Sequence, residues 1–145
     1  MKAELITLGT AKLAKEKDFN EYCKTGYVSR HFIEYRDIYL PKIEDFNLIH
    51  NTDNLTFIPL HEPWYYAPTQ DLLQRWLREK HNILVEVNFR NFAVKGTEGY
   101  FYMCGTKNEF WTMNNYFGET VFKGFNSYEE AMEVGLQQGL KLVKI

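Results

Sequence analysis

Residues able to do metal chemistry are few in this chain, and they are scattered. His61 and Glu62 invite comparison with the zinc motif H-E-x-x-H, in which two histidines one helical turn apart hold the metal and the glutamate acts as general base. Tyr65 occupies the position of the second histidine, and Pro63 opposes a helix there. The other histidines lie in unrelated segments, at His31, His50 and His81. The sequence therefore predicts no metal site and no cofactor.

Cys104 is the candidate nucleophile. It ends a predicted strand and precedes Gly105, so a tight turn could expose its thiol beside a histidine from elsewhere in the chain. Cysteine is among the most often buried residues, however, and Tyr102 shares its strand face, which favours a packed core thiol. The motifs G-x-S-x-G, G-x-G-x-x-G and the P-loop do not occur. We therefore expect no catalytic residue. The alternative is a small enzyme with a cysteine and histidine site assembled by the fold.

An aromatic cluster at Trp64, Tyr65 and Tyr66 is the first candidate for binding chemistry. It stands between Pro63 and Pro68, in a segment expected to be a loop. Three consecutive side chains cannot all face the core, so at least one ring is hard to bury. Trp and Tyr are enriched at protein interfaces and can stack on sugars or bases, but they also cover cores from surface loops. Both interpretations, a lid and a binding surface, remain open.

Arg75 and Arg78 are the second candidate, because they lie on a well-organised predicted helix. Asp71, Gln74 and Glu79 provide acidic or amide neighbours about one helical turn away, so pairing on the solvated face accounts for both arginines without a ligand. A DNA-reading helix would also need a second helix just upstream and a surplus of basic charge. The preceding segment, HEPWYYA, is aromatic and broken by proline.

Three helices are expected to position these residues. The first covers residues 8–17 and is capped by Thr7. The second has Pro68 in its first turn and ends at His81 and Asn82. Its apolar residues form one stripe, made of Leu72, Leu73, Trp76 and Leu77.

The third helix closes the chain and begins at an S-x-x-E capping box of Ser127 and Glu130. Ala131, Gly135 and Gly139 are spaced four apart and would form a groove of small residues along it. Each glycine costs about 1 kcal/mol in helix propensity. We therefore expect another element to pack closely into this groove.

Strands are predicted at residues 27–35, 55–60, 83–89, 99–104, 109–113 and 120–125. Turn residues separate the last four, which favours an antiparallel meander. No linker or repeat divides the chain. The sequence thus predicts a single α+β domain over residues 1–145, with a small antiparallel sheet of three to four strands packed against two to three helices.

Charge and composition narrow the function classes. The chain has 145 residues, a net charge of -2 and 25% charged residues, so it lacks the clustered basic charge that nucleic acid requires. No apolar run approaches the length of a membrane span. The two cysteines, Cys23 and Cys104, lie far apart, which indicates a reducing, cytoplasmic setting. We expect neither nucleic acid nor a membrane as partner.

Three segments carry a resemblance: ITLGTAKLAKEKDF, APTQDLLQRWLREKHNI and YEEAMEVGLQQGLKLVKI. Together they cover roughly half the chain and leave residues 21–66 unmatched. This pattern resembles small uncharacterised proteins of gut Bacteroidales bacteria and their phages, for which no activity is assigned. The resemblance implies a phage or mobile-element accessory protein and transfers no catalytic residue.

The expected function is a protein-interaction or self-associating module. Its binding surface is expected to comprise the aromatic cluster and the polar side of the second helix, with Trp64, Tyr65, Tyr66, Arg75 and Arg78 as candidate residues. The small enzyme is the first alternative. A weak single-stranded nucleic-acid binder that stacks bases on exposed rings is the second.

Overall fold

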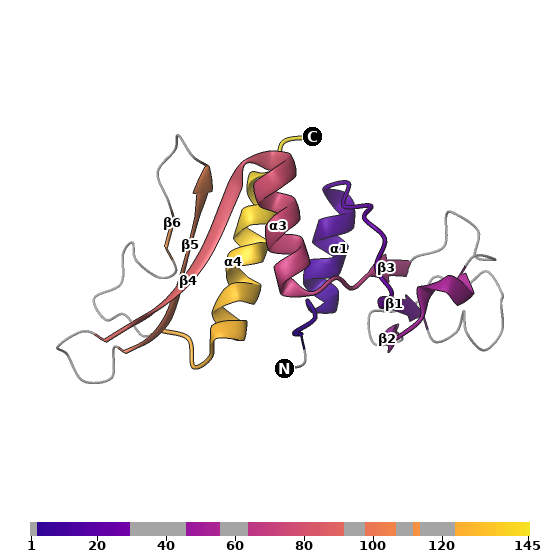
Figure 1. Ribbon diagram of the computed structural model, residues 1–145, viewed down its shortest axis with the longest axis horizontal. Helices are drawn as coiled ribbons and strands as arrows, with labels where there is room; N and C mark the ends of the chain where they lie inside the picture. Colours follow the sequence, from indigo (N-terminus) through magenta and orange to yellow (C-terminus); the bar gives the residue numbers. More distant parts are fainter. Residues whose placement is uncertain (1–2, 30–45, 56–63, 92–97, 107–111, 114–123) are drawn as a thin grey trace. The chain divides into compact units, whose positions relative to one another are not determined.

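The computed structural model describes residues 3–29, 46–55, 64–91, 98–106, 112–113 and 124–145. These residues form three α-helices and two antiparallel sheets of three strands each, which confirms the α+β class (Figure 1). They divide into two compact units. The N-terminal unit is Leu5–Pro68, and the C-terminal unit is Thr69–Ile145 together with Met1–Glu4. The sequence predicted one sheet, whereas each unit has its own.

The N-terminal unit contains helix α1 (Leu8–Glu16), a short 3₁₀ helix, η2 (Thr52–Leu55), and a three-stranded sheet. As predicted, Thr7 caps α1, its side chain accepting a hydrogen bond from the main-chain nitrogen of Thr10. The sheet has the order β2-β1-β3, from β1 (Gly26–Ser29), β2 (Phe46–Ile49) and β3 (Trp64–Tyr66).

The central strand β1 sets the register of this sheet. Tyr27 lies opposite Leu48 on one side and Tyr65 on the other. The phenol of Tyr27 donates a hydrogen bond to the carbonyl oxygen of Ile6, a buried residue just before α1. Strand pairing thus joins segments that are distant in sequence, because β3 follows β1 by more than thirty residues.

The C-terminal unit contains α3 (Gln70–His81), β4 (Ile83–Arg90), β5 (Gly99–Thr106), β6 (Thr112–Met113) and α4 (Tyr128–Leu142). The strands form the predicted meander, in the order β4-β5-β6. Helix α4 packs on the β4–β5 pair, and α3 contacts both α4 and β4 (Figure 1). This is the architecture predicted for the whole chain, realised within one unit.

Helix α3 has the predicted stripe but a different first residue. Thr69 is its N-cap, accepting a hydrogen bond from the nitrogen of Leu72, so Pro68 lies before the helix rather than in its first turn. The helix ends where Asn82 adopts a left-handed conformation, with φ 56°, which asparagine tolerates better than most residues. Trp76 is buried as predicted, with 5% of its surface exposed.

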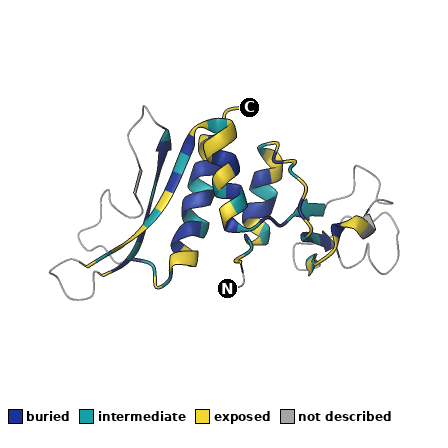
Figure 2. Ribbon diagram, viewed as in Figure 1, coloured by how far each residue is buried: buried dark blue, intermediate teal, exposed yellow. Residues whose placement is uncertain are grey.

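Helix α4 confirms the predicted close approach of another element. Gly135 and Gly139 are both buried. Buried residues recur along α4 in Figure 2. Ser127 caps the helix by accepting a hydrogen bond from the nitrogen of Glu130. A Cβ atom added to Gly135 would lie 2.9 Å from Cγ1 of Val85 on β4. One added to Gly139 would lie 2.9 Å from Cγ2 of the same valine. Only glycine allows α4 to lie this close to the sheet.

The strands predicted around residues 83–89 and 99–104 are present as β4 and β5. Tyr27 to Ser29 of β1 are the described part of the strand predicted at 27–35. Strand β6 is the described part of the strand predicted at 109–113. Of the strand predicted at 120–125, Phe125 forms an isolated bridge with Tyr100. Gly124 is described outside any strand, and Leu55 ends the 3₁₀ helix η2. The remaining residues of these predictions lie outside the described residues.

Candidate functional site

A pocket in the N-terminal unit, with a volume of about 570 Å³, is the candidate functional site. This is within the size range of small-ligand pockets. Ala11 and Phe19 are buried and provide apolar surface, while Trp64 and Tyr66 are half-buried. The remaining lining residues are exposed and polar: Lys15, Asp18 and Asn20. An apolar interior with a polar rim suits an apolar group held by a few directed hydrogen bonds.

The C-terminal end of α1 positions three of these residues. Lys17 caps the helix, and the nitrogens of Asp18 and Phe19 donate to the carbonyl oxygens of Lys15 and Ala14, respectively. This pair of hydrogen bonds is the Schellman arrangement, which needs a left-handed residue just after the cap. Asp18 fills that position with φ 63°. The reversal of the chain turns Phe19 back against the helix and leaves Asp18 at the rim.

Lys15 joins the helix to strand β3. Its Nζ atom donates a 2.8 Å hydrogen bond to the carbonyl oxygen of Trp64. The same atom lies 5.5 Å from the centroid of the Trp64 ring and 5.2 Å from that of Tyr65. Partial burial of the ammonium lowers the pKa of Lys15 below its ordinary value. The residue is therefore a cation placed against aromatic rings at the edge of the pocket.

A row of perpendicular rings continues from the pocket. Trp64 and Tyr66 meet edge to face, with 4.7 Å between ring centroids and an interplanar angle of 83°. Tyr22 packs on Tyr66 in the same manner at 6.2 Å, although 60% of its surface is exposed. The phenol of Tyr22 donates a 2.6 Å hydrogen bond to Oδ1 of Asp53, and this hydrogen bond raises the pKa of Tyr22. The exposed ring is thus fixed in place.

Tyr65 points to the other side of β3, because side chains alternate along a strand. Its ring lies 5.6 Å from that of Phe46 on β2. The Nζ atom of Lys12 lies 5.2 Å from the Phe46 centroid and 5.7 Å from the Tyr65 centroid. Lys12 and Lys15 thus approach one aromatic ring, that of Tyr65, together. We refer to Lys12, Lys15, Tyr65 and Phe46 as the lysine–aromatic patch.

The structure places the predicted aromatic cluster in a strand rather than in a loop. Trp64, Tyr65 and Tyr66 form β3, and all three are half-buried. As expected, the three consecutive rings are not all fully buried, because side chains alternate between the two sides of the strand. Two of them, Trp64 and Tyr66, line the pocket. The aromatic residues are brought together as a candidate binding surface.

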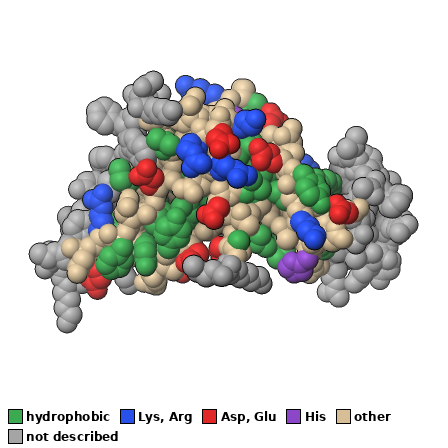
Figure 3. All heavy atoms as spheres, in the orientation of Figure 1, with side chains coloured by type: hydrophobic (Ala, Val, Ile, Leu, Met, Phe, Trp, Pro, Cys, Tyr) green, Lys and Arg blue, Asp and Glu red, His purple; other side chains and the backbone are tan. Residues whose placement is uncertain are grey.

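Arg75 and Arg78 lie elsewhere, on α3 of the C-terminal unit, and both are exposed. Basic and acidic side chains are interspersed over α3 in Figure 3. The predicted partners of Arg75 were Asp71 and Glu79. The ion pair that the described residues of α3 show is a loose one between Arg78 and Glu79, at 3.9 Å. The pocket does not include either arginine.

Sequence reasoning missed the α1 contribution to the pocket, namely Ala11, Lys15, Asp18, Phe19 and Asn20. The sequence predicts a helix over residues 8–17 that is capped by Thr7, and it assigns this helix no binding role. A glycine after the helix would have indicated a Schellman reversal, but Asp18 takes that position. The contact between Lys15 and Trp64 has no signal in the sequence.

Both cysteines, Cys23 and Cys104, are buried. Cys104 lies on β5 opposite Val85 and has no exposed surface, as expected of a packed core thiol. Cys23 is also buried, and desolvation raises its pKa to about 12, which disfavours the reactive thiolate. His61 and Glu62 lie outside the described residues. Among the residues that are described, no three His, Cys, Asp or Glu side chains form a group that could hold a metal ion.

Comparisons with known proteins identify no family. The chain matches no protein-family model, no curated protein and no solved structure. Within the described part of the chain, no helix has the length and apolar character needed to cross a bilayer. The function must therefore be argued from the pocket itself.

Proposed function

We propose that the protein is a protein-interaction module that holds a side chain of its partner in the pocket between α1 and β3. The observation that carries this proposal is the pocket itself, with half-buried Trp64 and Tyr66 beside a polar rim. Binding energy at protein interfaces is concentrated in a few aromatic and charged residues around pockets of this kind. The rings are held by their neighbours before binding, which lowers the entropy cost of association.

Catalysis has less support than binding. Each cysteine among the described residues is buried, and the pKa of Cys23 is raised, whereas a nucleophile needs an accessible thiolate. The polar groups that line the pocket are one carboxylate, one ammonium and one amide, together with the phenol of Tyr66 and the indole N–H of Trp64. In a binding module, these polar groups would orient the ligand. We further propose a reducing, cytoplasmic setting and a phage or mobile-element accessory role; the resemblance described above supports the latter.

Selection from a random-peptide display library tests the proposal. The wild-type protein is the bait, and library members that also bind the Trp64→Ala variant are removed beforehand. Enriched peptides are then synthesised and their dissociation constants measured by calorimetry. We expect micromolar binding that weakens at least tenfold in Trp64→Ala, since truncating an interface aromatic commonly costs more than about 1.4 kcal/mol.

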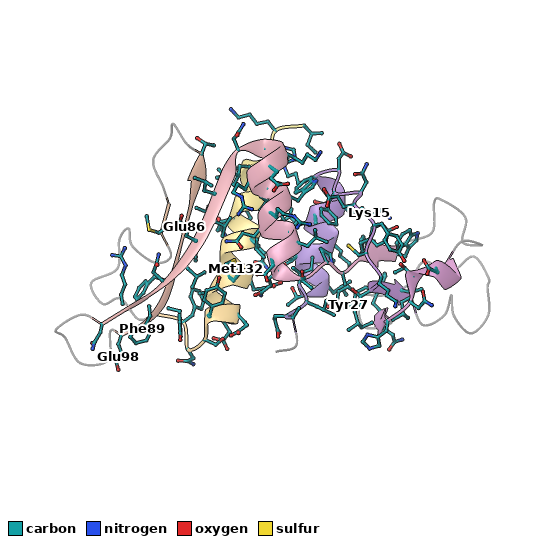
Figure 4. The ribbon with its side chains drawn as sticks, viewed as in Figure 1. Lys15, Tyr27, Glu86, Phe89, Glu98 and Met132 are labelled. Carbon is teal, nitrogen blue, oxygen red and sulfur yellow. The ribbon has the colours of Figure 1, made fainter. Side chains whose placement is uncertain are left out.

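Two further variants keep this test interpretable. Asn20→Arg places a bulky side chain at the exposed rim without touching the core, and should block binding in a protein that folds normally. Phe89→Ala removes a ring that is 57% exposed in the C-terminal unit, and should bind like the wild type (Figure 4). Circular dichroism verifies folding. Peptides that bind Asn20→Arg and wild type equally, or a library without enrichment, would refute the proposal.

Sedimentation velocity over a range of protein concentrations tests whether the partner is a second copy of the chain. In that case the wild type should associate, and Asn20→Arg should remain monomeric at the same concentrations.

A further inference from the structure

We infer that the partner segment is acidic: its carboxylates bind the ammonium groups of Lys12 and Lys15 while its apolar side chain enters the pocket. This inference rests on the proposed function and specifies the chemistry of the partner. The lysine–aromatic patch and the pocket share Lys15, so one extended peptide segment can engage both. An acidic peptide with a single apolar anchor is the ligand that matches them.

The ammonium groups of Lys12 and Lys15 lie beside the same aromatic ring. Both ammonium groups approach the ring of Tyr65, at 5.7 Å for Lys12 and 5.2 Å for Lys15. Like charges repel, so two ammonium groups beside one ring are stabilised by a negative group placed between or above them. Within the described residues, neither lysine forms an ion pair with a carboxylate. Desolvation and the nearby charge of Glu16 raise the pKa of Tyr65, but among the described residues Glu16 forms no ion pair with either lysine. A partner carboxylate would add a negative charge at the two ammonium groups.

Lys15 can form more hydrogen bonds than the one it makes to Trp64. An ammonium group has three donors, and the carbonyl oxygen of Trp64 takes one of them. Partial burial disfavours the charged form, as the lowered pKa of Lys15 indicates. A carboxylate would accept the remaining donors and favour the charged form again. The hydrogen bond to Trp64 holds the ammonium in position before the ligand arrives.

Nearby acidic residues favour a peptide over a nucleic acid. Glu16 and Asp18 alternate with Lys15 and Lys17 at the end of α1, and the whole chain carries a net charge of -2. A nucleic-acid backbone presents a continuous row of phosphates, which these carboxylates would repel and which two lysines cannot neutralise. A peptide can instead place isolated carboxylates at the lysines and avoid the acidic positions.

Fluorescence anisotropy with defined probes tests the inference. The probe is a labelled synthetic peptide with one tryptophan flanked on both sides by Asp and Glu. A matched peptide has Asn and Gln at the acidic positions, and a labelled single-stranded oligonucleotide is the third probe. At about 50 mM salt, where surface charges are weakly screened, we expect the acidic peptide to bind about tenfold more tightly than the neutral peptide.

Paired variants assign that preference to the two lysines. The double variant Lys12→Gln with Lys15→Gln should bind both peptides equally, whereas Lys12→Arg with Lys15→Arg should keep the preference because it keeps the charges. Lys141→Gln, on α4 of the C-terminal unit, removes the same charge from another surface and should behave like the wild type. Raising the salt concentration should reduce the preference.

The outcomes separate this inference from the proposed function. If the acidic and neutral peptides bind equally, and both lose binding in Asn20→Arg, the pocket remains a protein-binding site. The inference that the partner is acidic is then wrong. Tight oligonucleotide binding that disappears in the double glutamine variant would overturn it in favour of nucleic acid. If neither peptide binds the wild type, the acidic-partner inference is wrong, and the library selection decides separately whether the pocket binds protein.

Discussion

The Nζ atom of Lys15 lies 2.8 Å from the carbonyl oxygen of Trp64, 49 positions further along the chain. Main-chain groups of an antiparallel strand alternately face their partner strand and turn away from it. The main-chain nitrogen of Ala67 donates a hydrogen bond to the carbonyl oxygen of Thr25, next to β1, so the main-chain groups of Ala67 and Tyr65 face β1. Those of Tyr66 and Trp64 face away, which places the carbonyl oxygen of Trp64 on the outer side of β3. Lys15 therefore satisfies an edge-strand carbonyl. It ties α1 to the strand that carries the pocket aromatics.

This contact predicts that Lys15 positions Trp64. Lys15→Met should lower the free energy of unfolding by about 0.5–1.5 kcal/mol, the net value of a typical hydrogen bond. Lys15→Arg keeps a hydrogen-bond donor, so its free energy of unfolding should fall by less. Fluorine NMR of protein labelled with fluorotryptophan should show a shifted Trp64 resonance in Lys15→Met and an unchanged Trp76 resonance. Identical spectra for Lys15→Met and the parent would contradict the positioning role.

The packing of α4 against β4 predicts a large effect of a small substitution. Gly135→Ala places a Cβ atom 2.9 Å from Val85 and 3.0 Å from Cβ of Tyr102. Overpacking of this kind costs about 1–3 kcal/mol, which exceeds the gain of about 1 kcal/mol in helix propensity. Urea denaturation should therefore show a less stable protein.

Gly9→Ala is the matched control, because its nearest neighbouring atom would lie 4.0 Å away, in open surroundings on α1. It should leave stability unchanged or raise it by up to about 1 kcal/mol. A Gly135→Ala protein as stable as Gly9→Ala would show that α4 can move away from the sheet at little cost.

Burial of Trp76 predicts the cost of its removal. Trp76→Ala should lower the free energy of unfolding by about 3–5 kcal/mol, because the side chain is 5% exposed and its indole packs on the ring of His81 at 4.4 Å. Arg75→Ala, at the preceding exposed position, should change stability by no more than about 0.5 kcal/mol. Comparable denaturation midpoints for the two variants would argue against the buried stripe.

Alkaline pH should destabilise the protein. Desolvation raises the pKa of Cys23 from 9.0 to about 12, and the pKa values of Tyr65 and Tyr66 are also raised by desolvation. The unfolded chain therefore releases these protons first. The contribution of these groups to the free energy of unfolding is fully present below about pH 9, and it is lost as the pH rises towards their folded-state pKa values.

Urea denaturation at neutral pH and at about pH 10, under reducing conditions, measures this loss. The lowered pKa of Lys15 acts in the opposite direction, so the test compares Cys23→Ala with the parent at each pH. The variant should be less stable at neutral pH but should lose less stability on going to alkaline pH. A pH dependence equal to that of the parent would exclude Cys23 as a source of the effect.

Local signals in the sequence were enough to predict the three helices. Thr7 and Ser127 cap helices as predicted, and the apolar stripe of α3 places Trp76 in the core. The four-residue spacing of Gly135 and Gly139 also predicted that another element packs against α4. Caps and helical periodicity depend on residues within one or two turns of each other, so they can be recognised without knowing the fold.

The division of the strands into two sheets and the pocket itself came only from the tertiary structure. Strand β1 pairs with β2 and β3 through contacts between distant segments, and such pairing depends on the whole chain rather than on local preference. Asp18 adopts a left-handed conformation that glycine usually provides, so the reversal that brings Phe19 to the pocket was hidden. The residues 64–66 were recognisable as aromatic. Their contact with Lys15 could not be predicted from the sequence, because a hydrogen bond between residues 49 positions apart forms only when the fold places β3 beside α1.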